Sequence, residues 1–467
     1  MTVMKKFFIG ILVLALSCMS VQARKVRGTV RCGSEPLSGV VVTDGYGFAM
    51  TQKSGKFVLE VSDEAEFVYI VTPAGHVADW SSGVPAFYIS ISGQNRFDFQ
   101  LNRTAEGSEY HIIAVSDPQT YSDEHFAEFA ALPLEDMART AAAFEGTGVG
   151  LVLGDISWDR IEILDMYKKE IVRTGIPFYP VVGNHDNEAY VQGDREASAS
   201  YRRKMGPENY AFFLGNEVVI VLDNIIYDTN FKCRIGYTDQ VMSWVEGLLE
   251  VLPADAGLYI AQHAPLGHGD RRIINGDRLL DLVRGRRVNF LSGHTHVNAN
   301  HLIEKDIRDH NVGAVCGAWW DTKHCTDGTP RGYKVFTMSD GGLSWYYKPV
   351  GLGKDHIAEV FSLGETPEFP EAVVVNVWDW DPDWKVEWYE DGVFKGTMEQ
   401  VRAVSAVFTA EIEAAYRTAG QDIPRWKRGR PSSHNFAAVP SPSAGTVTVC
   451  VESPFGQKWS RTVELAR

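Results

Sequence analysis

Short stretches of alternating apolar and polar residues fill the chain from residue 24 to about residue 104. A period of two places apolar side chains on one face of a strand, and the Gly, Pro, Ser and Asp residues between the stretches are typical of turns. Strands are predicted at residues 26–30, 39–43, 56–61, 67–72 and 97–101. Residues 24–104 are therefore expected to fold as an N-terminal β-sandwich.

From residue 105 to residue 354, strand patterns alternate with helix patterns. The predicted strands are residues 112–115, 150–153, 178–182, 210–213, 218–222, 258–262 and 288–291. The predicted helices are residues 123–144, 161–172 and 239–252. Such alternation is typical of an α/β domain in which helices cover the sheet on both faces.

Strand patterns return in residues 355–467 and predict a C-terminal β-rich domain, a second β-sandwich. Its strands are expected at residues 372–377, 385–389, 446–451 and 459–465, with a helix at 409–418 and a Pro-, Ser- and Arg-rich loop at 424–443. The tryptophan-rich run at residues 378–384 has two interpretations. Its rings bind a carbohydrate, or they pack this domain against the middle one.

The first 23 residues have the features of a cleaved export signal. Lys5 and Lys6 precede an apolar run at residues 7–16, and Val21-Gln22-Ala23 provides small residues for a signal peptidase. The run is too short to span a bilayer comfortably, and no later stretch reaches the roughly 20 apolar residues of a membrane helix. We expect a periplasmic or secreted protein without a transmembrane segment. A lipid anchor on Cys18 is the alternative, because Ala15-Leu16-Ser17-Cys18 loosely resembles a lipoprotein cleavage box.

Composition and charge exclude several classes of function. The chain has 467 residues, of which 45% are hydrophobic, as in folded globular proteins. Its 45 Lys and Arg against 60 Asp and Glu give a formal charge of −15, which argues against nucleic acid as a partner. The cysteines show no Cys-x-x-Cys spacing, so neither a zinc knuckle nor a disulfide framework is indicated. Cys316 and Cys325 either pair or remain buried thiols.

Five short polar motifs of the middle domain each follow a predicted strand. They are Asp117-Pro118-Gln119, Gly154-Asp155, Gly183-Asn184-His185-Asp186, Gln262-His263-Ala264-Pro265 and Gly293-His294-Thr295-His296. Strand ends of an α/β domain present side chains from a rigid sheet to an open crevice. Carboxylate, carboxamide and imidazole groups without thiolate suit borderline divalent metal ions. The motifs together therefore predict a metal site.

In this order the motifs resemble those of the calcineurin-like metallophosphoesterase superfamily. The resemblance implies a four-layered αββα core with two metal ions at the carboxyl ends of two facing sheets. The N-terminal module, with Pro36-Leu37-Ser38-Gly39 and Ser54-Gly55-Lys56-Phe57, resembles transthyretin-like or carboxypeptidase-regulatory-like modules. The chain as a whole, with β-modules on both sides, is similar to exported three-domain members typical of gut Bacteroidetes.

The resemblance also assigns roles to single residues. Asp117, Gln119, Asp155 and His296 would hold the first metal ion, and Asp155, Asn184, His263 and His294 the second. His185 matches the family's uncoordinated histidine near the leaving group, and Asp186 the carboxylate that orients it. Gln119 departs from the commoner His, as in a minority of members that includes Mn-dependent ADP-ribose/CDP-alcohol diphosphatases. A carboxamide oxygen is a harder and weaker donor, so Mn is expected, with Fe, Zn or Mg as alternatives.

The expected function is binuclear hydrolysis of a phosphodiester or diphosphate by metal-activated hydroxide. The substrate would be a small phosphorylated molecule such as a nucleotide, lipid or sugar phosphate. A phosphomonoesterase is one alternative. A surface glycan-binding protein with a vestigial metal site is another, which the complete ligand set disfavours. The β-modules are expected to supply no chemistry, because no motif ligand precedes Asp117 or follows His296. For Trp319 and Trp320, core packing is favoured over stacking on a base.

Overall fold

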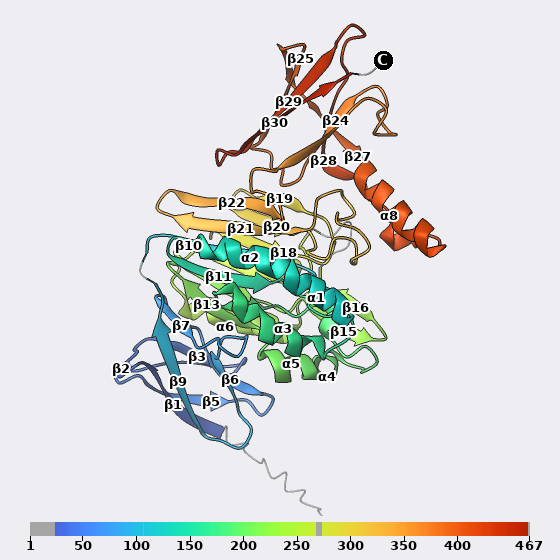
Figure 1. Cartoon of the computed structure of the whole chain (residues 1–467). Coiled ribbons are helices and arrows are strands. Elements are labelled where there is room, and N and C mark those ends of the chain that lie inside the picture. Colours follow the sequence, from blue (N-terminus) through green and yellow to red (C-terminus); the bar gives the residue numbers. More distant parts are fainter. Residues whose placement is uncertain (1–23, 106, 268–272, 466–467) are drawn as a thin grey trace, which may run out of the picture.

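The computed structural model describes residues 24–105, 107–267 and 273–465 (Figure 1). Residues 1–23 lie outside this range, so the export signal and the lipid anchor on Cys18 remain predictions from the sequence. Within the described residues, no helix has the length and apolar character needed to cross a membrane. Three modules follow one another along the chain in Figure 1.

The N-terminal module is a β-sandwich, as the alternating pattern predicts. One sheet contains β1 (Arg24–Cys32), β2 (Glu35–Pro36), β5 (Lys56–Val61), β7 (His76–Ala78) and β9 (Arg96–Arg103). The other contains β3 (Val41–Thr43), β4 (Phe48–Met50), β6 (Phe67–Ile70) and β8 (Tyr88–Ser90). In β5 every second residue is buried, which places Phe57, Leu59 and Val61 in the core.

Two facing sheets form the centre of the middle domain. The first has the order β12 (Phe178–Pro180), β11 (Thr147–Val152), β10 (Tyr110–Val115), β21 (Gly332–Ser339) and β22 (Gly342–Pro349). The second has the order β13 (Tyr210–Leu214), β14 (Glu217–Val221), β17 (Leu258–Ala261), β18 (Val288–Ser292), β20 (Ile307–Asn311) and β19 (Ala299–Glu304). β10, β11 and β12 run parallel, as do β14, β17 and β18, so their carboxyl ends lie at one edge of each sheet.

Helices cover the outer faces of both sheets, which gives the predicted four-layered αββα core. Ile113 and Val115 of β10 pack with the helices over the first sheet, whereas Ile112 and Ala114 share a core with the second sheet. The helices over the first sheet are α1 (Asp123–Ala131), α2 (Pro133–Ala142), α3 (Ile163–Ile171) and α5 (Ala199–Met205). α6 (Asp239–Val251) and α7 (Gly276–Val283) pack into the core of the second sheet.

One predicted helix is divided. The pattern over residues 123–144 predicts a single helix, but α1 ends at Ala131 and α2 begins at Pro133. Proline lacks a backbone N–H and is favoured in the first turn of a helix, so a new helix begins there. The hairpin of β15 (Ile225–Thr229) and β16 (Lys232–Ile235), together with β19 to β22, was not predicted.

The C-terminal module contains two four-stranded sheets. One has the order β23 (Ala358–Phe361), β24 (Val373–Val377), β28 (Ser432–Ala438) and β27 (Glu399–Ala403). The other has the order β26 (Val393–Thr397), β25 (Lys385–Glu390), β29 (Thr446–Glu452) and β30 (Lys458–Glu464). α8 (Ala406–Ala419) projects from the sandwich in Figure 1.

The predicted loop at residues 424–443 is wrong in part, because it contains β28 and the short helix η3 (Arg425–Lys427). β28 lies between β24 and β27 although its first four residues, 432–435, are polar. Its His434 is buried between the side chains of Asn376, at 2.7 Å, and Asp327, at 3.0 Å. In this first half of β28, hydrogen bonding thus replaces apolar packing, whereas Phe436 and Ala438 in its second half lie in the apolar core.

The tryptophan-rich run packs the C-terminal module against the middle domain. Trp378 is only 4% exposed, whereas Trp384, 6% exposed, lies in the core of the C-terminal module itself. The Trp378 carbonyl accepts a hydrogen bond of 2.7 Å from the Asn298 side chain, and Lys334 Nζ lies 2.9 Å from Asp379 Oδ1. These contacts support the packing interpretation of the run over carbohydrate binding.

Candidate metal centre

The five motifs occupy the carboxyl ends of five strands in the two facing sheets. Asp117 and Gln119 follow β10, Asp155 follows β11, and Asn184 begins a short helix, η2 (Asn184–Asp186), after β12. His263 follows β17, and His294 and His296 follow β18. Because these strands are parallel within each sheet, their polar ends meet at one place.

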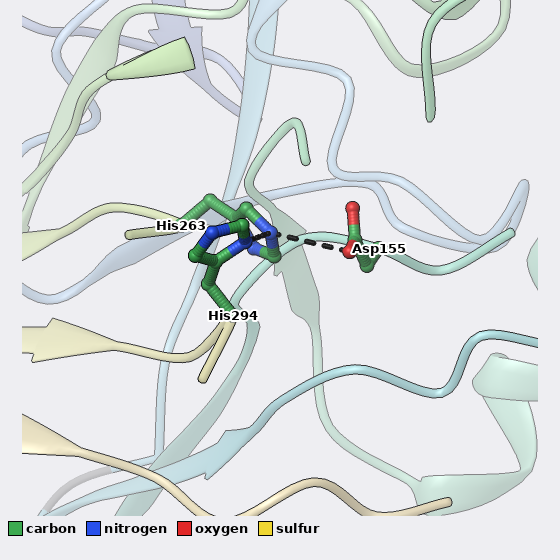
Figure 2. Close-up of side chains that lie close together, drawn as sticks. All are labelled: Asp155, His263 and His294. Carbon is green, nitrogen blue, oxygen red and sulfur yellow. Dashed lines mark hydrogen bonds and ion pairs between the residues drawn. The ribbon is translucent and has the colours of Figure 1, made fainter. Parts of the chain in front are cut away.

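Three predicted ligands lie close enough together to hold one ion. Asp155, His263 and His294 each offer a ligand atom, and these atoms lie within 4.8 Å of one another (Figure 2). His263 Nε2 is 3.3 Å from Asp155 Oδ2 and 3.1 Å from His294 Nδ1. Asp155 and His263 are 1% and 0% exposed, so this cluster is shielded from bulk water.

The other four predicted ligands adjoin these three. Gln119 Nε2 donates to Asp155 Oδ2 at 2.9 Å, and Asn184 Oδ1 lies 3.1 Å from His263 Nε2. Asp117 Oδ2 accepts the backbone N–H of His294 at 2.9 Å, and Asp117 Oδ1 lies 3.6 Å from His296 Nε2. The structure therefore brings all seven side chains together.

Two buried oxygens indicate that this group of residues fits a cation. Asp117 Oδ1 and Gln119 Oε1 have no hydrogen-bond partner within the described part of the chain, although both residues are almost fully buried. Buried polar atoms are nearly always paired, and an unpaired acceptor costs folding free energy. A bound metal ion would satisfy both oxygens, and the oxygen and imidazole donors suit Mn, Fe or Zn.

Backbone carbonyls fix which ring nitrogen two of the histidines present. His263 Nδ1 lies 2.7 Å from the Leu153 carbonyl, and His296 Nδ1 lies 3.0 Å from the Gly317 carbonyl. A carbonyl can only accept, so Nδ1 donates and Nε2 is left as the ligand atom in both rings. Such hydrogen bonds commonly orient metal-binding histidines.

Most of the predicted ligands have an unusual backbone conformation. Five of the seven predicted ligands have positive φ angles: Asp117 51°, Gln119 38°, Asp155 52°, His294 70° and His296 53°. Residues other than glycine seldom adopt this region, and the strain is typical of functional sites. The surrounding contacts thus hold the ligands in conformations that isolated loops would avoid.

The glycines of the motifs allow a close approach of backbone to ligand. A Cβ on Gly183 would lie 2.2 Å from the backbone nitrogen of Asp155 and 2.2 Å from its Oδ1. Gly183→Ala should therefore displace Asp155, weaken metal binding and lower the Tm by roughly 2 °C or more, because overpacking costs about 1–3 kcal/mol. Thermal melts of the metal-free and metal-loaded chain measure both effects.

Gly341→Ala is the matched control for this variant. A Cβ there would lie 3.5 Å from Ser339 Oγ, an ordinary contact, and Gly341 lacks a positive φ. Equal melting temperatures and equal metal affinities for the two variants would contradict the close packing of Gly183 against Asp155.

Asp155 and the neighbouring imidazoles shift one another's pKa values. Burial opposes a charge on Asp155, but His263 and His185 hold the pKa of its carboxyl well below the usual range. Burial likewise opposes a charge on His263, yet Asp155 raises the pKa of its ring to about 10. In the absence of metal, a proton on His263 neutralises Asp155, so a metal ion must displace that proton to bind.

The role expected for Asp186 is corrected. Its carboxylate accepts backbone N–H groups from Ser157 at 2.9 Å and Gly183 at 3.0 Å, so it fixes the motif loops. Burial and the nearby Asp155 carboxylate raise the pKa of Asp186 to about 7. The ring of His185 is held instead by Asp159, whose Oδ1 lies 3.0 Å from His185 Nδ1. The one sequence signal for Asp159 is its place four residues after Asp155.

Tryptophans contact two histidines of the site, His296 and His185. Trp319 stacks on His296 at 4.4 Å, and Trp320 Nε1 donates to the Pro118 carbonyl at 3.0 Å. Both rings are only partly buried, so core packing stays a prediction. Trp158 lies 5.7 Å from the His185 ring. Trp426 of the C-terminal module lies 4.6 Å from Trp319. No sequence motif marks Trp158 or Trp426. The C-terminal module thus contacts rings beside the site, while the expectation that it supplies no chemistry stays a prediction.

Comparison with known proteins bears on all three modules. Residues 110–298 match the family model "Calcineurin-like phosphoesterase". Residues 24–104 and 309–459 match the models "N terminal of Calcineurin-like phosphoesterase" and "C terminal of Calcineurin-like phosphoesterase". No curated protein matches the chain.

Several solved structures are similar at low sequence identity. A dimetal phosphatase from Danio rerio is 14% identical over 52% of this chain and 96% of that one, with a TM-score of 0.37. A 5'-nucleotidase from Candida albicans is 12% identical over 52% of each chain, with a TM-score of 0.34. A purple acid phosphatase from Lupinus luteus seeds is 12% identical over 67% of each chain, with a TM-score of 0.37.

Proposed function

This chain belongs to the calcineurin-like phosphoesterases and is a metal-dependent phosphoric ester hydrolase, and from that premise we propose that it hydrolyses a phosphodiester or a diphosphate. The observation that carries the proposal is the cluster of Asp155, His263 and His294 with the four further predicted ligands that adjoin it, two of whose buried oxygens lack hydrogen bonds. Gln119 favours the diester or diphosphate, because the members with Gln that this chain resembles include diphosphatases.

The ligands divide into two sets that share one carboxylate. Asp117, Gln119, Asp155 and His296 would hold one ion, and Asp155, Asn184, His263 and His294 would hold the other. When bound, two such ions neutralise charge on the phosphoryl group and lower the pKa of water enough to attack phosphorus. Asp155 suits the shared position because it lies at the centre of the cluster and its pKa is held low.

His185 is placed to give a proton to the leaving oxygen. Its backbone N–H donates to Asp155 Oδ1 at 2.9 Å, which fixes the residue beside the ligand cluster. Asp159 accepts from Nδ1, so Nε2 is the ring atom that can move a proton. Because the ring is 22% exposed, a substrate can reach it.

The test compares two chromogenic substrates on the full chain. After removal and return of Mn, we expect faster hydrolysis of bis-p-nitrophenyl phosphate than of p-nitrophenyl phosphate. The reverse order would favour the phosphomonoesterase. Glycan-array binding without metal-dependent hydrolysis of either ester would favour the surface glycan-binding protein.

We also propose Mn as the native metal, because Gln119 gives Zn a poorer ligand than imidazole would. Gln119→His should raise the affinity of the first site for Zn by about tenfold or more relative to Mn. Turnover need not rise, since tighter ground-state binding does not stabilise the transition state. Calorimetric titration of the metal-free chain with each metal measures the shift.

The matched control is Gln52→His, which adds the same ring at an exposed position of the N-terminal module. It should leave both affinities and the metal order as they are in the unaltered chain. If Gln119→His did the same, Gln119 would not be a ligand.

A further inference from the structure

A segment of the C-terminal module reaches the metal centre. Trp426 of η3 lies edge to face against Trp319 at 4.6 Å and against Trp158 at 6.4 Å. Trp319 stacks on His296, and Trp158 lies beside His185. One indole of a flanking module is therefore a single ring away from a predicted metal ligand and from the proposed proton donor.

The segment that carries Trp426 is anchored. Lys427 is 8% exposed, pairs with Asp321, and lies over the rings of Trp426 at 5.0 Å and Trp319 at 5.7 Å. The Arg430 backbone N–H donates to the Thr326 carbonyl at 2.9 Å. Contacts on both sides thus hold Trp426 in place.

Trp426 nevertheless stays exposed. Its exposed fraction is 48%, and within the described part of the chain it is the one tryptophan among the exposed large hydrophobic residues. The ring of Tyr121 is 46% exposed and lies 5.4 Å from the ring of Trp158. Tyr121, Trp158 and Trp426 form what we call the aromatic wall. Two of these rings are half-exposed and Trp158 is partly buried, so the wall offers apolar faces to a ligand.

We propose that the aromatic wall binds the leaving group of the substrate, and that this leaving group contains a flat ring. The inference rests on the proposed function, in which His185 protonates the leaving oxygen, because Trp158 lies against His185. Aromatic and sugar rings both present flat faces that stack on indole. Arg425, Arg428 and Arg430 on the same segment bring positive charge to a chain of net charge −15, which favours a phosphorylated ligand.

The experiment uses the Mn-loaded full chain and three methyl phosphodiesters. Their second alcohols are phenol, a glucoside hydroxyl and propanol. Trp426→Ala should lower kcat/KM for a ring-bearing ester, relative to the propyl ester, by about tenfold or more, the usual effect of losing a stacking partner. A lower ratio of kcat/KM for the phenyl ester to that for the propyl ester indicates that the leaving group contains an aromatic ring. A lower ratio for the glucosyl ester to the propyl ester indicates a sugar. Phe394→Ala, a 54% exposed ring elsewhere in the same module, should keep both ratios.

A binding measurement separates this inference from the proposed function. Calorimetry should show that Trp426→Ala weakens phenylphosphonate or glucose 6-phosphate binding, but not propylphosphonate binding, by a similar factor. That result supports the aromatic wall even if no ester is hydrolysed, in which case the proposed function alone fails. The inference would be overturned if Trp426→Ala and the unaltered chain had the same kcat/KM ratios and the same affinities for the ring-bearing ligands relative to propylphosphonate. This holds whatever the absolute rates of hydrolysis are.

Discussion

Asp155→Asn should abolish turnover, with a loss of about 10³-fold or more, and should remove the second metal equivalent. Asp155 is 1% exposed and lies within bonding reach of His263, Gln119 and the backbone of His185. An amide keeps the shape of the side chain but lacks the negative charge that two cations would share. A loss of several kcal/mol of charge stabilisation corresponds to the expected decrease of about 10³-fold in turnover.

Metal analysis and hydrolysis of bis-p-nitrophenyl phosphate measure the two effects in the same preparation. Asp281→Asn is the control, since that carboxylate is 67% exposed and pairs only with Arg284 among its described ion pairs. Normal metal content and an unchanged rate in Asp155→Asn would show that this carboxylate is not shared between two ions.

His185→Ala should lower the rate by about 10²- to 10⁴-fold on esters with poor leaving groups and should spare metal binding. The Nδ1 atom of the ring lies 3.0 Å from Asp159 Oδ1, and His185 is not one of the seven predicted ligands. An alkoxide needs a proton as it departs, whereas p-nitrophenolate departs without one. The loss should therefore be much smaller for a nitrophenyl ester than for an alkyl ester.

A series of alkyl and nitrophenyl esters tests this role, with metal content measured alongside. His356→Ala, an exposed histidine, is the control for removing an imidazole from the chain. An equal loss on both kinds of ester would exclude proton donation by His185 and would leave it a structural role.

Much of the candidate site follows from the sequence, for a physical reason. Short polar motifs directly after apolar strands meet wherever the strands are parallel, so Asp155 and His263 come together from separate sheets. Their glycines mark close approaches, as the 2.2 Å that a Cβ on Gly183 would leave to Asp155 shows. Neither inference needs tertiary detail.

The rest depends on contacts that no local pattern encodes. Asp159, which contacts His185, has a positive φ of 55°. Nothing in the sequence Trp158-Asp159 predicts that backbone conformation. Trp426 reaches Trp158 across 268 positions of the sequence, and β28 is a strand whose buried His434 is satisfied by Asn376 and Asp327. Asp186 was given the wrong role because sequence adjacency to His185 does not imply contact with its ring.

The central claim is that two metal ions, sharing Asp155, serve one hydrolytic site. The most direct measurement is a titration of the metal-free full chain with Mn, followed by paramagnetic resonance and by hydrolysis of bis-p-nitrophenyl phosphate in the same samples. We predict two Mn per chain, a spin-coupled pair, and activity that rises with the second equivalent. Activity that is complete without added metal, or two ions that show no coupling, would contradict the account.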